Sequence, residues 1–147
     1  IIPSFLNSAQ KKSLVWYSSS MKGWIALDID GTITSNKYSV PKEVIGYLKI
    51  LQSDGWKIAI ATGRSFLFAS LALSEFDFPY VLLVQNGSAA LKMPKKDLFY
   101  KSYLEPSAIS EIEKAFEGIE GNFLLYAGYE KGDFCYYRPD RFSEEHM

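Results

Sequence analysis

The sequence predicts an α/β fold, with a parallel sheet in residues 21–88 and an α+β unit in residues 89–147. Three short apolar runs, at residues 24–27, 57–61 and 80–84, have the length of buried strands. Helical stretches separate the first from the second run and the second from the third. Because parallel strands need crossover connections, this alternation favours a parallel sheet with helices on its faces.

The two crossover helices differ in pattern. The first is expected to begin near Pro41 and to end before Asp54, with one apolar stripe made of Val44, Leu48 and Leu51. The second is expected over residues 65–75, which are apolar nearly all round. An amphipathic helix covers one face of a sheet, so the first helix is expected to pack on the strands through its stripe.

The pattern changes after residue 88. Residues 98–104 alternate as a strand does, residues 106–117 read as a helix, and residues 122–129 and 133–138 flank a turn at 130–132. This succession predicts an α+β unit with a hairpin. Its aromatic side chains fit either of two interpretations, the packed interior of the hairpin or a surface that faces a substrate: Tyr126, Tyr129, Phe134, Tyr136 and Tyr137.

Composition excludes several classes of protein. The chain has 147 residues and a formal charge of −1, with no basic run longer than two, which excludes nucleic acid as the main partner. No apolar stretch approaches the roughly 20 residues of a membrane-spanning helix, so we expect no membrane anchoring. With Cys135 as the single cysteine and His146 as the single histidine, neither an internal disulfide nor a zinc cluster can form. Any metal must then have oxygen ligands.

The first 20 residues read as an N-terminal extension. They end in a run of three serines, and Met21 directly precedes the first regular segment, so the natural start could lie there. Their apolar pieces are too short for the core of a signal peptide. Export is not indicated, and we expect a cytoplasmic protein.

The strongest chemical signal follows the first strand. Asp28 and Asp30 are two residues apart, so in extended geometry their carboxylates point to the same side. Such a pair repels itself unless a cation is present, and a hard, oxygen-ligated ion such as Mg²⁺ meets that need. With a phosphate ester bound, one carboxylate can attack phosphorus while the other gives a proton to the leaving oxygen. We expect Mg²⁺ as the cofactor.

Polar residues also end the other two strands. Thr62, Gly63 and Arg64 follow the second strand, where a hydroxyl and free backbone N–H groups could bind phosphoryl oxygens. Arg64 could add a bidentate contact to an anionic group, or form a helix-start ion pair. Asn86 follows the third strand and could hold Asp30 or the substrate, although Asn86-Gly87 also fits a plain turn. Since ligands bind beyond the carboxyl ends of parallel strands, we expect these residues to lie together.

These motifs resemble those of a known family. Residues 24–32, residues 58–64 and Asn86-Gly87 look like the successive motifs of haloacid dehalogenase-like phosphatases of the Cof-type subclass IIB, in family order and with family-like spacing. The resemblance implies a Rossmann-like core with an inserted α+β cap from about residue 89. It also implies Asp28 as nucleophile, Asp30 as general acid/base, and Thr62 as phosphate-binding hydroxyl. Family members hydrolyse sugar phosphates or similar small phosphate esters with Mg²⁺.

The sequence also departs from the family. A lysine that steadies the aspartyl-phosphate and a later Gly-Asp-x-x-x-Asp metal motif are missing, because the Gly-Asp pair at 132–133 has no second aspartate where the motif needs it. The resemblance therefore covers an N-terminal half: part of the core in residues 21–88 and a partial cap in residues 89–147. We expect self-association or pairing with a missing C-terminal half.

Three functions stay open at this point. The leading one is a Mg²⁺-dependent phosphatase that acts on a small phosphorylated substrate and whose remaining half is absent from this chain. The second is a truncated, non-catalytic relative that binds a phosphate ligand or a partner protein. The third is an interaction module in which the carboxylates are incidental. Downstream coding sequence, inspected for the lysine and the acidic motif, would discriminate among them.

Overall fold

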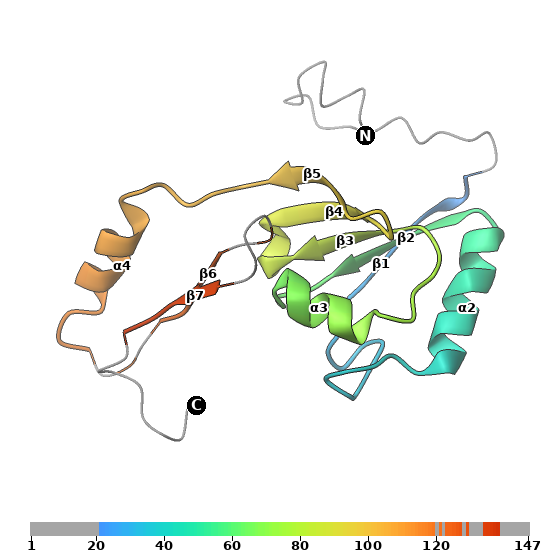
Figure 1. Ribbon diagram of the computed structural model, residues 1–147, viewed down its shortest axis with the longest axis horizontal. Helices are drawn as coiled ribbons and strands as arrows, with labels where there is room; N and C mark the ends of the chain where they lie inside the picture. The colour runs from blue at the N-terminus through green and yellow to red at the C-terminus, as the bar shows by residue number, and fades with distance from the viewer. Residues whose placement is uncertain (1–20, 120, 122, 128, 130–133, 139–147) are drawn as a thin grey trace, which may run out of the picture.

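The computed structural model describes residues 21–119, 121, 123–127, 129 and 134–138 (Figure 1). The predicted extension at residues 1–20, the hairpin turn at 130–132 and His146 lie outside these described residues. The remaining elements form a sheet with two helices, followed by a helix and a hairpin that lie at one end of the sheet (Figure 1).

The sheet has five strands in the order β1-β2-β3-β4-β5. The predicted α/β fold is confirmed, because β1 (Gly23–Leu27), β2 (Trp56–Ala61) and β3 (Tyr80–Val84) pair in parallel. The sheet as a whole is mixed, since β4 (Ala89–Met93) and β5 (Asp97–Lys101) continue it in antiparallel pairing. The sequence interpretation did not include a strand at β4.

The register of the parallel strands positions their carboxyl ends. Leu27 of β1 lies opposite Ile60 of β2, and Ala61 of β2 lies opposite Leu83 of β3. The three strands therefore end at the same edge of the sheet. The residues that follow them begin at that edge, as the sequence predicts.

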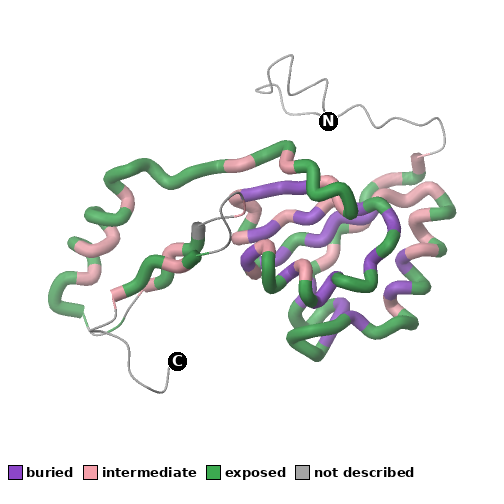
Figure 2. Tube along the Cα trace, viewed as in Figure 1, coloured by how far each residue is buried: buried purple, intermediate pink, exposed green. Residues whose placement is uncertain are grey.

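Helices α2 (Lys42–Ser53) and α3 (Phe66–Ala72) pack on one face of the sheet. Their buried side chains join those of alternate strand residues in one core, which includes Ile45, Leu48, Ala69, Ile60, Leu82 and Leu91. Figure 2 shows this buried region over the sheet and the helix faces that touch it. The helix expected over residues 65–75 ends early because the backbone turns, with the Phe76 N–H donating to the Leu73 carbonyl at 2.9 Å.

The opposite face of the sheet carries small and apolar side chains with Lys57 and Lys92 among them, and no described helix covers it. Trp24 is 52% exposed, Ala26 and Ala61 are exposed, and Val81 and Leu83 are half-buried on this face. Strand β1 is an edge strand, since within the described residues it pairs with β2 alone. An unpaired edge beside an uncovered apolar face is a surface suited to association.

The second half of the chain contains α4 (Ala108–Ala115) and a hairpin of β6 (Leu125–Ala127) and β7 (Phe134–Tyr136). The helix and hairpin agree with the sequence expectation for this region. The domain boundary expected at residue 88 lies between β3 and β4, which are paired in the same sheet. The division into a core and a partial cap stays a prediction. Figure 2 shows that α4 and the hairpin are mainly exposed or half-buried.

Tyr129 ties the hairpin region to the core. Its ring packs edge-on against Phe66 at the start of α3, with ring centroids 4.7 Å apart. Its hydroxyl donates to the Lys96 carbonyl in the β4–β5 turn at 2.5 Å. Two contacts to separate core elements fix the end of the hairpin near α3.

None of the helices in the described part of the chain combines the length and the apolar character that crossing a bilayer requires.

We predict that the isolated 147-residue chain self-associates through the uncovered sheet face. Trp24→Lys should shift it toward monomer, because it replaces an exposed indole on the edge strand of that face with a charge. Size-exclusion chromatography with light scattering measures this directly. Tyr47→Lys is the matched control, since Tyr47 is 62% exposed on α2, away from the sheet face. A parent chain that is monomeric with a sharp cooperative melt would contradict the prediction.

Candidate functional site

Residues that follow β1 and β2 line a cleft of about 570 Å³ at the carboxyl edge of the sheet. Asp28 and Asp30 come from the loop after β1, and their side chains are exposed while Ile29 between them is fully buried. This alternation points both carboxylates to the cleft side. The other lining residues come from the same loop, from the β2–α3 segment, from α3 and from β6: Lys37, Tyr38, Thr62, Gly63, Arg64, Ser65, Phe68 and Tyr126.

A tight turn after β1 shapes one wall of the cleft. Gly31 has a φ of +73°, in the left-handed region that glycine adopts without strain. Its N–H donates to the Thr34 carbonyl at 2.9 Å, and the Thr34 hydroxyl donates to the Ser39 carbonyl at 2.6 Å. The Asn36 side-chain oxygen accepts from the Tyr38 N–H at 2.8 Å. These bonds hold residues 31–39 in one conformation.

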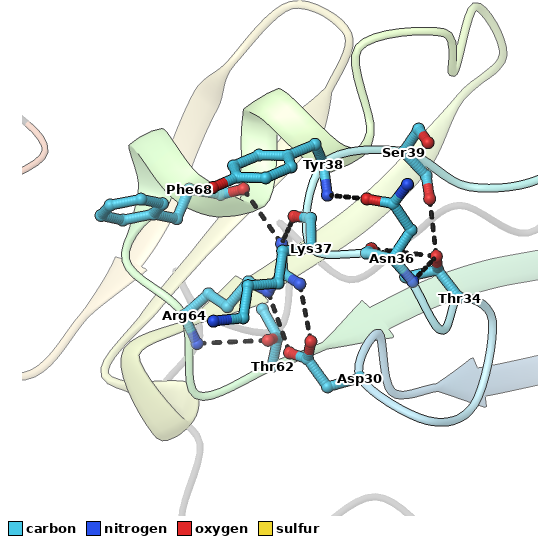
Figure 3. Close-up of polar contacts among 9 residues, drawn as sticks. All are labelled: Asp30, Thr34, Asn36, Lys37, Tyr38, Ser39, Thr62, Arg64 and Phe68. Carbon is cyan, nitrogen blue, oxygen red and sulfur yellow. Dashed lines mark hydrogen bonds and ion pairs between the residues drawn. The ribbon is translucent and has the colours of Figure 1, made fainter.

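Arg64 joins this loop to the β2–α3 segment (Figure 3). Its Nε donates to Asp30 Oδ2 at 2.9 Å and its Nη2 to Asp30 Oδ1 at 2.6 Å, which is a bidentate ion pair. On the other side, Nη1 donates to the Lys37 carbonyl at 2.6 Å and lies 3.4 Å from the Phe68 carbonyl. The Arg64 side chain is 13% exposed, so most of it is shielded from water.

The ion pair changes the protonation chemistry of Asp30. The hydrogen bonds from Arg64 lower the pKa of the Asp30 carboxyl, with further lowering from the charges of Arg64 and Lys37. The same pair raises the pKa of Arg64. Asp30 is therefore held as a carboxylate, which is the form that accepts a proton.

Thr62 and Gly63 form the floor of the cleft between β2 and α3. Thr62 is buried, with 5% of the residue exposed. Its Oγ1 accepts from the Arg64 N–H at 3.2 Å, which leaves its own O–H free to donate. A Cβ on Gly63 would come within 3.0 Å of the Asn86 side-chain oxygen, so glycine allows the two strand ends to approach closely. The Asn86 N–H donates to the Thr62 carbonyl at 3.2 Å, which fixes this approach.

Asn86 itself lines a neighbouring cavity of about 500 Å³. The two cavities share Gly63 and Tyr126, and the second is bounded by the hairpin residues Phe134 and Tyr136. Asn86 and Gln85 have φ values of 56° and 52°, which are unusual for residues other than glycine. The structure thus brings together five of the six sequence-predicted site residues in one cleft and sets Asn86 beside them.

Sequence reasoning missed five cleft residues as site components. Lys37 and Tyr38 lie in the loop after β1, Ser65 directly precedes α3, Phe68 lies in the first turn of α3, and Tyr126 reaches the cleft from β6. Tyr126 is one of the hairpin aromatic residues with two interpretations, and its place in the cleft fits the one in which it faces a substrate. The others carry no motif that spacing alone reveals.

The carboxylate oxygens in the cleft suit a hard cation as ligands. Asp28 and Asp30 supply carboxylate oxygens, and each oxygen of Asp30 keeps a further lone pair beyond its bond to Arg64. Across the described stretches, no group of three or more acidic, histidine or cysteine side chains lies close enough together to hold a metal ion. The two carboxylates are thus the ligands that this part of the chain offers.

Comparison with known proteins identifies the family of the chain. The family model for haloacid dehalogenase-like hydrolases matches residues 25–146. A phosphoglycolate phosphatase of Methanopyrus kandleri is 36% identical over 67 residues, which are 46% of this chain and 29% of that protein. A phosphoglycolate phosphatase of Sulfolobus acidocaldarius is 25% identical over 124 residues, which are 78% of this chain and 50% of that protein.

Solved structures show the same fold. A haloacid dehalogenase-superfamily phosphatase from Bacteroides thetaiotaomicron has a TM-score of 0.60 at 27% identity, over 83% of this chain and 44% of that one. A haloacid dehalogenase-like hydrolase from B. subtilis has a TM-score of 0.61 at 21% identity, over 73% of this chain and 37% of that one. The chain spans half or less of the length of each relative named here.

We predict that Arg64→Met raises the pKa of Asp30 toward the ordinary aspartate value, because the variant loses both hydrogen bonds to the carboxylate. Carbon-detected NMR titration of the aspartate carboxyl groups measures this pKa. Because the pKa of Asp30 is lower in the folded than in the unfolded protein, its ion pair stabilises the fold fully at a pH above the unfolded-state pKa. This stabilisation is lost as the pH falls through the folded-state pKa. The stability difference between parent and variant should therefore shrink at acidic pH.

Lys49→Met is the control for this titration. Lys49 donates a hydrogen bond that lowers the pKa of Asp77, far along the chain from the cleft. The control should raise the pKa of Asp77 and leave that of Asp30 where it is. An Asp30 pKa that is the same in Arg64→Met and in the parent would show that the ion pair does not form in solution.

Proposed function

Because the chain belongs to the haloacid dehalogenase-like hydrolase family, we propose that its site is that of a Mg²⁺-dependent phosphatase acting on a small phosphate ester, a sugar phosphate or similar. The observation that carries the proposal is the cleft itself, in which two carboxylates face a threonine hydroxyl across the ends of adjacent parallel strands. The activity is proposed for this chain together with further sequence of the kind that its longer relatives have. The cytoplasmic location stays a prediction.

Asp28 is the proposed nucleophile. Its carboxylate oxygen attacks phosphorus, the bond from phosphorus to the ester oxygen breaks, and an aspartyl-phosphate forms on Asp28. The Thr62 hydroxyl and the nearby backbone N–H groups donate to the phosphoryl oxygens and orient them. Phosphoglycolate phosphatase is the name of two relatives, which supports a small ester as the substrate class.

Asp30 is the proposed general acid and base. Its carboxylic acid gives a proton to the departing alkoxide, and the resulting carboxylate then takes a proton from the water that attacks the aspartyl-phosphate. That second step breaks the bond from phosphorus to Asp28, releases inorganic phosphate and restores both aspartates. Because Arg64 favours the ionised form, the acid step requires the ion pair to open, whereas the base step does not.

Asp28 and Asp30 are also the proposed ligands of Mg²⁺. The ion, when bound, would offset the negative charge of the phosphoryl oxygens beside two carboxylates. The alternative function is a non-catalytic chain that binds a phosphate ligand or a partner. Phosphate binding without turnover, measured on this chain together with further sequence of the kind that its longer relatives have, would favour this alternative.

We predict that, in the enzyme of full family length, Asp28→Asn lowers phosphate release on the order of 10⁴-fold or more, since an amide cannot attack phosphorus. Asp30→Asn should lower the rate of phosphate release from alkyl phosphates about 10²–10⁴-fold. It should lower the rate with p-nitrophenyl phosphate much less, because the phenolate leaves with little need of a proton. Steady-state release of inorganic phosphate measures both.

Asp77→Asn is the matched control, because it makes the same change at an exposed aspartate outside the cleft. It should leave both rates unchanged. Equal losses on the two substrates for Asp30→Asn would remove the general-acid role from Asp30. Full activity in Asp28→Asn would contradict the covalent mechanism.

A further inference from the structure

Arg64 is the obvious cation to bind a substrate, yet its donors are already in use. Each of its three guanidinium nitrogens donates within the protein, two of them to Asp30 and the third to the Lys37 carbonyl. With its side chain only 13% exposed, Arg64 presents little of its surface to the cleft. An anion that bound to Arg64 would have to displace these contacts.

Lys37 is the other cation of the cleft. It is exposed, it lines the same cavity as Asp28 and Asp30, and its ammonium makes no ion pair within the part of the chain that the structure describes. An ammonium has three donors on a flexible stem and can turn toward an anion without first losing a partner. Its charge also acts on Asp30, so it lies within electrostatic reach of the reacting groups.

The loop that carries Lys37 is held in place from both sides. Arg64 Nη1 binds the Lys37 carbonyl at 2.6 Å, and the neighbouring Tyr38 N–H is bound to the Asn36 side chain at 2.8 Å (Figure 3). The backbone of Lys37 is thereby fixed relative to Asp30, which the same guanidinium binds. A fixed backbone and a free ammonium are what a ligand-binding lysine needs.

We infer that Lys37 binds the anionic oxygens of the substrate in this cleft, and that Arg64 is a positioning residue that holds Asp30 and the loop carrying Lys37. The inference rests on the proposed phosphatase site and adds to it a substrate-binding cation after the first strand. The anionic oxygens belong either to the phosphoryl group or to a second acidic group on the ester, and the same chemistry serves both.

The test is an NMR titration of the 147-residue chain in Mg²⁺-containing buffer with inorganic phosphate, ethyl phosphate and phosphoglycolate. The last two differ by the exchange of a methyl group for a carboxylate. Lys37→Met should weaken binding about tenfold or more, as expected for the loss of a charge-assisted hydrogen bond. Lys37→Arg, which keeps the charge, should retain most of the affinity. Lys42→Met, an exposed lysine at the start of α2 outside the cleft, should bind as the parent does.

The three ligands distinguish the two sources of the anion. If Lys37→Met binds all three ligands more weakly than the parent, Lys37 contacts the phosphoryl group. If it binds only phosphoglycolate more weakly, Lys37 contacts the second acidic group. Either result supports the inference. If Lys37→Met binds all three as the parent does, the inference is wrong while the proposed function stands. If the parent binds none of them, the inference is wrong for this chain, and the proposed function is judged by turnover in the enzyme of full family length.

A double-mutant cycle tests the role of Arg64. If Arg64 acts through Lys37, Arg64→Met weakens phosphate binding in the parent and has little further effect in the Lys37→Met background. Equal weakening in both backgrounds would mean that Arg64 contacts the ligand itself, which overturns its positioning role. A purely structural loss of fold would instead lower the affinity and the melting temperature together in both backgrounds.

Discussion

The parallel pairing of β1, β2 and β3 is the constraint on which the site depends. Strand register sets where each strand ends, and here Leu27 lies opposite Ile60 while Ala61 lies opposite Leu83. The segments that follow begin at residues 28, 62 and 85, which are 34 and 23 residues apart in sequence. They nevertheless begin side by side, because adjacent strands of a sheet lie about 5 Å apart. A shift of one residue in β1 would turn Asp28 to the other face, and the same shift in β2 would turn Thr62.

The ion pair between Arg64 and Asp30 is the second interaction that positions the site. The ion pair of Arg64 with Asp30 connects the first strand end to the second, and the bond from Arg64 to the Lys37 carbonyl adds the loop between them. Exposed ion pairs contribute little to stability as a rule. The bidentate geometry and the shielding of Arg64 make this one an orienting contact, and it favours the ionised Asp30. Positioning and protonation are thus linked through one side chain.

The sequence predicted the parallel core well because each of its three strands is a short apolar run that ends in polar residues. It missed β4, because the residues Ala-Ala-Leu-Lys-Met favour a helix by intrinsic propensity and become a strand only through antiparallel pairing with β3. The site aspartates and Thr62 could be found from local spacing. Lys37, Phe68 and Tyr126 could not, because only the folding of the loop, of α3 and of the hairpin brings them to the cleft.

The central claim is that Asp28 is phosphorylated during turnover. The stereochemical course at phosphorus tests it most directly, in the enzyme of full family length, with an alkyl phosphorothioate made chiral by two oxygen isotopes and hydrolysed in water labelled with the third. Transfer to Asp28 and then to water is two in-line displacements, so the account predicts net retention of configuration. Net inversion would show a single displacement by water and would contradict the account.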